Sequence, residues 1–140
     1  MTADEAIARL GLAPHPEGGH YAETYRHLPP GGGRGACTSI HYLLKAGERS
    51  HWHRVDAVEV WNFHAGETLL LKIAQGGQVR EVRLGADLAA GEVPQAVVPP
   101  GAWQAARPLG AWSLVGCTVA PAFEFAGFEL APPGWEPTQE

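Results

Sequence analysis

The sequence predicts an all-β protein, built as a sandwich or a closed barrel. The 18 glycines and 12 prolines are about a fifth of the 140 residues, well above the roughly 12% of an average protein. They are spread along the chain and separate short apolar, β-branched and aromatic runs at intervals of roughly 6 to 12 residues. No long βαβ crossover interrupts this pattern. A double-sheet jelly roll best fits about eight to ten such strands.

One short helix is expected before the strands, over residues 3–10. Thr2 is placed to cap its start, and Glu5 completes a capping box. Gly11 stands where a C-terminal cap belongs. At its other end the chain is rich in proline, which lacks the N–H that a central strand needs. Residues 1–140 are therefore expected to form a single domain, with the helix in 1–12, the barrel in 14–131 and a tail in 132–140.

Turn signals divide the barrel region into individual strands. Three consecutive glycines from Gly31 follow two prolines and indicate a loop. Gly76-Gly77 closes a hairpin between two of the later strands. The strands are expected at residues 18–26, 36–44, 58–64, 68–74, 79–84, 95–98, 103–106, 112–119 and 123–130, with the segment from Gly47 leading through the histidines of residues 51–53.

Composition excludes several classes of function. The net charge is −5 and no basic stripe occurs, so nucleic acid is not an expected partner. The acidic N-terminus does not resemble a secretory signal, and no apolar run approaches the roughly 20 residues that span a membrane. Cys37 and Cys117 are interpreted as buried thiols in a reducing cytosol, with a disulfide or a thiolate ligand as the alternatives. The expected location is therefore cytoplasmic.

The most informative segment contains His51, His53, Glu59 and Gly66. Residues i and i+2 of a strand face the same side, roughly 6.5–7 Å apart, so both imidazoles are expected in one pocket. Glu59 would join them from a neighbouring strand. Two imidazoles and a carboxylate can bind a divalent metal such as Fe, Mn, Zn or Ni, with Gln104 as a weak fourth ligand. The alternative is a polar pocket without metal.

This segment resembles the first motif of the cupin superfamily, in which HxH is followed by a glutamate and then a glycine. Five residues separate His53 from Glu59 here, where the motif has three or four. Pro99-Pro100-Gly101 matches the turn of the second motif, but Gln104 stands in place of its histidine. The resemblance implies a cupin-type double-stranded β-helix, an RmlC-like jelly-roll barrel, and a homodimer.

Other motifs resemble one small cupin family without a firmly assigned activity, of the type called Cupin_5. That resemblance covers nearly the whole chain and implies that His53 and Glu59 matter more than His51. Its motifs are His15-Pro16-Glu17-Gly18-Gly19 with Tyr21, Glu23 and Tyr25; Trp52-His53-Arg54; Glu59-Val60-Trp61; Val98 to Gln104; and Gly116 to Phe125.

Further residues are assigned to the pocket or away from it. Glu17 is expected at the barrel mouth, binding a ligand hydroxyl or orienting a histidine, and Trp103 is expected to form a pocket wall. His41 and Tyr42 are neighbours on one strand and face opposite sides, so one of them faces the pocket, and the sequence leaves open which one. The residues expected in turns, on the surface or away from the site are His15, His20, His27, Arg54, His64 and Glu124.

Three functions follow from this pocket. The first is binding of a small polar molecule, such as a sugar or a nucleotide sugar, by Glu17, His51, His53, Glu59, Trp103 and Gln104. The second is an enzyme that uses His53 and Glu59, either as a metal-dependent oxygenase or isomerase or as a metal-free epimerase. The third is a non-catalytic interaction domain with a relic pocket.

Overall fold

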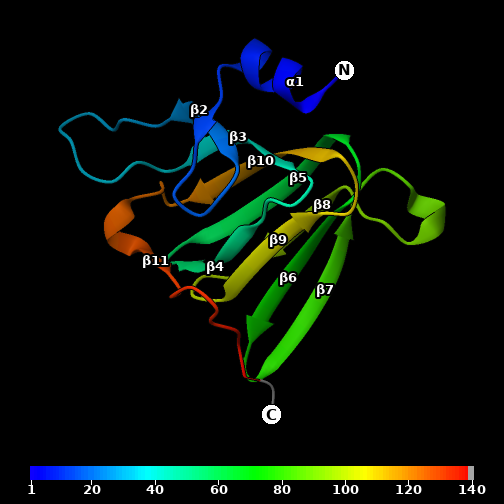
Figure 1. The fold of residues 1–140 in the computed structure, drawn as a ribbon. Coiled ribbons are helices and arrows are strands. Elements are labelled where there is room, and N and C mark those ends of the chain that lie inside the picture. Colours follow the sequence, from blue (N-terminus) through cyan, green and yellow to red (C-terminus); the bar gives the residue numbers. More distant parts are fainter. Residues whose placement is uncertain (139–140) are drawn as a thin grey trace.

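Two antiparallel β-sheets pack face to face in the computed structural model, which describes residues 1–138 (Figure 1). In the first sheet the order is β1 (Ala13–Pro14), β2 (His20–Arg26), β3 (Thr38–Lys45), β10 (Trp112–Ala120), β5 (Val58–Gly66) and β8 (Gln95–Val98). In the second it is β11 (Phe128–Leu130), β4 (Ser50–Val55), β9 (Trp103–Pro108), β6 (Leu69–Gln75) and β7 (Gln78–Leu84). This is the predicted cupin-type jelly roll.

The core lies between the inner faces of the two sheets. Trp61 of β5 is fully buried, as are Leu69 and Leu71 of β6. Alternate residues point inward along each strand, so Glu59 and Phe63 share the inner face with Trp61, as the sequence predicts. The inward position at the start of β5 therefore delivers a carboxylate into the barrel.

Helix α1 (Ala3–Leu10) covers part of the outer face of the first sheet. The Thr2 hydroxyl accepts a hydrogen bond from the Glu5 backbone N–H at 3.1 Å, and Gly11 ends the helix with a positive φ of 65°. Ala6 packs with Leu12 against Leu43 of β3. The predicted helix and both of its caps are therefore confirmed.

The strand predicted for residues 123–130 is wrong except over its last three residues. Residues 121–124 form a connection, Phe125–Gly127 is a 3₁₀ turn (η2), and β11 covers the last three residues. Arg34 Nε donates to the Ala122 carbonyl at 2.8 Å, and Arg26 Nη1 donates to the Phe123 carbonyl at 3.1 Å. These carbonyls bind side chains instead of a neighbouring strand, so the segment crosses the barrel end. A second 3₁₀ turn, η1 (Leu88–Ala90), follows β7.

The C-terminal segment lies against the outer face of the second sheet. The Trp135 ring is 4.5 Å from the Trp103 ring and 6.2 Å from the Trp52 ring, between centroids. Of the tail expected at 132–140, residues 139–140 lie outside the described residues. Within the described part of the chain, no helix is long and apolar enough to cross a membrane.

Candidate functional site

A β-bulge in β4 decides which histidine enters the barrel. Ser50 pairs with Ala106 and His53 with Gln104, so three steps along β4 match two steps along β9. Both Ser50 and His53 are consequently buried on the inner side. The expectation that His51 and His53 share one pocket is wrong, because the extra residue turns His51 outward. Its Nε2 lies 2.9 Å from the Pro132 carbonyl of the tail.

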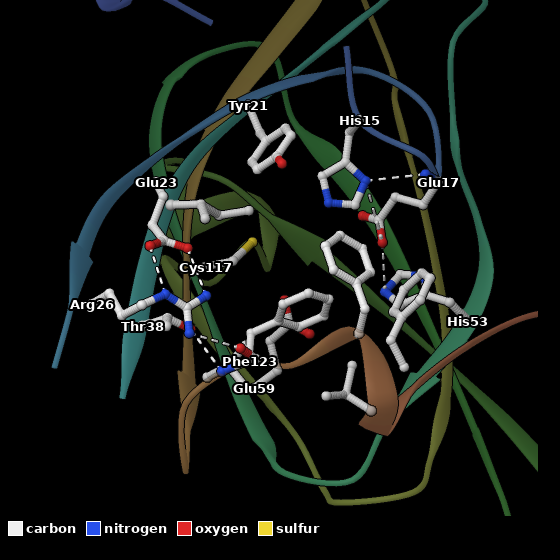
Figure 2. Close-up of a pocket in the computed structure, with 15 residues that line it drawn as sticks. His15, Glu17, Tyr21, Glu23, Arg26, Thr38, His53, Glu59, Cys117 and Phe123 are labelled. Carbon is white, nitrogen blue, oxygen red and sulfur yellow. Dashed lines mark hydrogen bonds and ion pairs between the residues drawn. The ribbon is translucent and has the colours of Figure 1, made fainter. Parts of the chain in front are cut away.

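The inner cavity opens at the end of the barrel that the segment of residues 121–127 crosses (Figure 2). Its volume is about 70 Å³, or about 590 Å³ when the open space at its mouth is included. The lining is polar at the buried end and aromatic at the mouth. It consists of His15, Glu17, Tyr21, Glu23, Arg26, Thr38, Ile40, His53, Val55, Glu59, Cys117, Val119, Phe123, Phe125 and Phe128.

Glu17 and His53 form a buried pair at the closed end. Glu17 Oε2 lies 3.1 Å from His53 Nε2, and the two side chains are 7% and 2% exposed. The other Glu17 oxygen accepts a hydrogen bond from the Ser50 hydroxyl at 2.8 Å. The turn of residues 15–19 positions this carboxyl, since the His51 backbone N–H donates to the Glu17 carbonyl at 2.9 Å. The orienting contact expected of Glu17 is thus made to His53, but the expected location at the barrel mouth is wrong, because the carboxyl is buried at the closed end.

Hydrogen-bond directions fix the proton in this pair. His53 Nδ1 lies 2.8 Å from the His51 carbonyl, and a carbonyl oxygen accepts but does not donate, so Nδ1 carries a proton. Burial lowers the pKa of His53 and raises the pKa of Glu17. Both shifts favour the neutral pair, in which the protonated Glu17 carboxyl donates to His53 Nε2. The directions of both pKa shifts therefore favour a proton on Glu17 over a proton on His53 Nε2.

Glu59 is a second buried carboxyl, held by a chain of side-chain hydrogen bonds. Trp61 Nε1 donates to Gln104 Oε1 at 2.8 Å, and Gln104 Nε2 donates to Glu59 Oε1 at 2.9 Å. Burial is the main cause that raises the pKa of Glu59 to about 7. Both protonation states of this carboxyl are therefore populated near neutral pH, which suits a general acid or base.

Cys117 lies beside Glu59 in the lining. Burial raises the pKa of this thiol well above its ordinary value, and the Glu59 carboxyl is a further cause. Both Cys37 and Cys117 are free thiols, so the disulfide alternative is wrong. A neutral thiol is a weak nucleophile, and Cys117 belongs to the wall of the cavity.

His15 is one of several polar lining residues that the sequence interpretation missed, the others being Tyr21, Glu23, Arg26 and Thr38. Its side chain is 8% exposed, and its Nδ1 accepts the Glu17 backbone N–H at 3.0 Å. Its ring lies 4.5 Å from the Tyr21 ring in an edge-to-face contact. A histidine in a Pro-Gly-rich turn predicts exposure, and the signal that points inward is its place next to Glu17 in the shared motif.

The sequence analysis also did not predict the aromatic residues at the mouth of the cavity. Phe123 and Phe128 lie 5.6 Å apart between centroids, and Phe128 lies 5.6 Å from His53. Arg26 lies beside Phe123, whose carbonyl it binds, and forms a two-bond ion pair with Glu23 at 2.9 Å for each bond. Phe123 faces inward only because the chain leaves the expected strand there, a change that no residue pattern marks.

Trp103 does not wall the cavity, contrary to the expectation. It neighbours Gln104 on β9, and successive strand residues face opposite sides. With Gln104 buried inside, Trp103 lies on the outer face, where the Arg54 guanidinium is 4.6 Å from its ring centroid. Arg54 also pairs with Glu129 at 2.8 Å, so it is a surface contact as expected. Tyr42 rather than His41 faces inward, and its hydroxyl donates to the Gly18 carbonyl.

The residues present do not fit the metal site considered from the sequence. Within residues 1–138, no group of three or more His, Cys, Asp or Glu side chains is arranged to hold a metal ion. His51 points away from the barrel, and both polar ends of the Gln104 amide are bonded to Trp61 and Glu59. The four expected ligands His51, His53, Glu59 and Gln104 are therefore not brought together.

Comparison with known protein families identifies the family to which this chain belongs. The family model described as Cupin superfamily (DUF985), Cupin_5, matches residues 4–131. The chain belongs to this cupin family. A Shewanella oneidensis protein of known structure is 42% identical, with 94% of this chain and 85% of that chain covered and a TM-score of 0.87. A hypothetical protein from Leishmania major is 34% identical over 94% of this chain and 88% of that chain, with a TM-score of 0.85.

More distant cupins share the fold. The oxalate decarboxylase from Bacillus subtilis is 13% identical over 84% of this chain and 29% of that chain, with a TM-score of 0.64. At this identity the likeness concerns the fold alone. No curated protein matches the chain. The DUF985 cupin assignment therefore defines the architecture and leaves the chemistry to the residues of the cavity.

Proposed function

We propose that this DUF985 cupin binds a small, neutral, hydroxylated molecule of the sugar class in its barrel and transfers a proton on it, as an isomerase or epimerase does. The observation that carries the proposal is the convergence of Glu59 with the Glu17–His53 pair in one buried cavity. The pKa of Glu59 is near 7. A general base works best when its pKa lies near the working pH.

The aromatic mouth supports a ligand with an apolar face. Phe123, Phe125 and Phe128 pack edge to face around the opening. Pockets for small molecules commonly combine such apolar walls with a few convergent polar groups. A sugar presents C–H groups on its ring faces and hydroxyl groups at its edges, so it matches both parts of this lining.

The charges of the lining favour a neutral ligand over the nucleotide sugar that the sequence left open. Glu17, Glu23 and Glu59 supply three carboxyl groups, and Arg26 is the lone arginine or lysine among the described lining residues. Each of the three guanidinium nitrogens of Arg26 donates a hydrogen bond within the protein. Nε and Nη2 bind the Glu23 carboxylate, and Nη1 binds the Phe123 carbonyl. A diphosphate would meet no free cation there.

Thermal unfolding with a small panel of ligands tests the binding. A ligand that binds the folded state raises the melting temperature. Erythritol, D-ribose and D-fructose are expected to include at least one ligand that raises it, whereas UDP-glucose is expected to have no effect. Glu59→Gln should weaken binding about 10-fold or more, and Glu129→Gln, outside the cavity, should bind as the wild type does. Stabilisation by UDP-glucose alone would contradict the proposal.

A second candidate is binding without turnover, because the same lining would serve a carrier or sensor. An experiment in D₂O distinguishes binding with proton transfer from binding without turnover. Proton transfer in D₂O places deuterium in the bound sugar, which ¹H NMR detects as a lost signal. A binder that never exchanges a carbon-bound proton would be assigned to the second candidate.

A further inference from the structure

His15 has one ring nitrogen that the fold uses and one that it leaves for a ligand. Nδ1 accepts the Glu17 backbone N–H at 3.0 Å. A backbone N–H only donates, so Nδ1 must present its lone pair. A neutral imidazole carries one proton, and in this geometry that proton lies on Nε2.

The second nitrogen points into the cavity. Figure 2 shows it on the side of the ring away from the Glu17 N–H, facing the open space between Tyr21 and Cys117. Among the described residues, no hydrogen bond reaches Nε2, and this nitrogen is not a fully buried atom, because His20 Nδ1 is the one such atom without a partner. His15 Nε2 is therefore open to the cavity that its side chain lines. An N–H that faces a cavity can donate to whatever molecule fills that cavity. A ligand oxygen in the cavity would lie in the direction that this donor faces (Figure 2).

The local geometry also keeps the ring uncharged. A second proton would sit on Nδ1 and point at the Glu17 N–H, which cannot accept it. Glu17 Oε2 is 3.9 Å from Nδ1, too far for a hydrogen bond that would stabilise such a cation. Burial acts in the same direction and lowers the pKa of His15. The ring is a fixed, neutral donor.

We propose that the ligand is a hydroxycarbonyl compound, and that His15 Nε2–H donates to its carbonyl oxygen while Glu59 acts on the neighbouring carbon. The inference rests on the proposed function and names its substrate class. His15 and Glu59 both line the cavity, and Figure 2 draws them in different parts of it.

The step balances within these groups. The Glu59 carboxylate takes a proton from the carbon next to the carbonyl, and the electrons of that C–H bond form a C=C bond. The carbonyl π electrons move to oxygen, and the resulting enolate oxygen accepts the His15 hydrogen bond. Glu59 then returns a proton to carbon. If the carboxyl proton exchanges with D₂O first, deuterium enters the substrate.

Two substitutions distinguish the structural role of His15 Nδ1 from the proposed ligand-binding role of Nε2. In His15→Asn the side-chain oxygen can take the place of Nδ1, because an Asn side chain accepts the N–H two residues on in an Asx turn. Its amide nitrogen ends short of the Nε2 position. In His15→Gln the amide nitrogen can reach the Nε2 position, but the acceptor for the Glu17 N–H is lost.

The experiment measures deuterium exchange of dihydroxyacetone and D-erythrulose in D₂O, together with melting temperature. His15→Asn should keep the wild-type melting temperature and lose about 100-fold in exchange rate, as the loss of one oxyanion donor does. His15→Gln should melt lower and keep more of the exchange rate than His15→Asn. Wild-type exchange in His15→Asn would overturn the inference.

Nitrogen-15 NMR of the histidines completes the test. In free protein near pH 7, the His15 Nε2 signal should be that of a protonated nitrogen and the Nδ1 signal that of an unprotonated one; the reverse would overturn the inference. A probe that shifts the Nε2–H signal without exchanging would refute the proton transfer and leave the His15 contact standing. If neither probe shifts that signal, the inference fails.

Discussion

At the residue scale, two buried carboxyl groups with raised pKa values make the barrel interior able to hold and release protons. Glu17 and Glu59 are 8% and 7% exposed, and burial is the main cause that raises the pKa of each. Serine, histidine and glutamine side chains satisfy their oxygens, so the cost of burial appears as a preference for the protonated form rather than as a missing hydrogen bond.

Glu59→Gln tests this preference through the pH dependence of stability. The pKa of Glu59 is about 7 in the folded protein against an ordinary 4.5, so the folded state holds the extra proton between these values. The contribution of Glu59 to the free energy of unfolding is therefore present below pH 4.5 and is lost as pH rises through 7. The difference in free energy, wild type minus Glu59→Gln, should fall by about 3 kcal/mol between pH 4.5 and 8. Urea unfolding at several pH values measures it, and a difference that stays constant would be inconsistent with a raised pKa.

Gln104 is expected to act on stability as well as on the site. Gln104→Leu leaves the Trp61 N–H and one Glu59 oxygen buried without their partner, which should cost about 3 kcal/mol. Gln95 makes a similar side-chain bond to Asn62, but that residue is exposed. Gln95→Leu should therefore change the free energy of unfolding by about 0.5 kcal/mol or less. Equal effects in urea unfolding would rule out the buried chain as a stabilising element.

At the scale of elements, the turn of residues 15–19 and the bulge in β4 together build the site. The Gly18 φ is +112°, and a Cβ there would lie 2.0 Å from the Arg49 carbonyl oxygen. The turn can therefore sit directly on β4, next to the bulge that points Ser50 and His53 inward. Glu17 reaches His53 because these two irregular elements touch.

Gly18→Ala should separate this close approach from ordinary backbone strain. Gly33 also has a positive φ, of +90°, but a Cβ there would meet no atom within 4 Å. Gly33→Ala should cost about 1 kcal/mol for the left-handed backbone alone. Gly18→Ala adds a clash with backbone and should cost about 3 kcal/mol or more. Differential scanning calorimetry of both variants gives the comparison, and equal losses would argue against the close packing of the turn.

The same elements show what sequence can and cannot predict. Regular strands obey the period-two rule, so Glu59, Trp61 and Phe63 are found where parity puts them. His51 departs from that rule because one extra residue in β4 reverses its side, and neither Trp52 nor the flanking residues signal a bulge. Alternation also prevents Trp103 and its neighbour Gln104 from facing the same pocket, so the expectation for Trp103 fails.

At the scale of the whole molecule, the N-terminal helix and the cupin topology follow from turn spacing and shared motifs. The described residues form eleven strands, slightly more than the eight to ten expected. The pairing of residues far apart in sequence does not follow from these patterns. Glu17 and His53 meet only once β4 and the turn before β2 lie together, and residues 121–127 cross the mouth because arginine side chains bind their carbonyls. A motif identifies such residues without stating which of them touch.

The homodimer expected from the sequence stays a prediction. Strand β7 is an outer strand with charged Arg80, Glu81 and Arg83, which discourage pairing with another chain. Strand β1 pairs with β2 only at His20 and Tyr21 among the described residues. The open edge of β2 is therefore where a second copy is expected. Sedimentation equilibrium should give twice the chain mass of 14.9 kDa, and the single-chain mass throughout would refute the dimer.

Carboxyl ¹³C NMR of the glutamate side chains over pH 3 to 9 tests the acid–base interior most directly. Two resonances, assigned with Glu17→Gln and Glu59→Gln, should titrate above the ordinary value of 4.5, and that of Glu59 near 7. If every glutamate instead titrates in the ordinary range, the barrel holds no poised carboxyl groups and the proposed chemistry is contradicted.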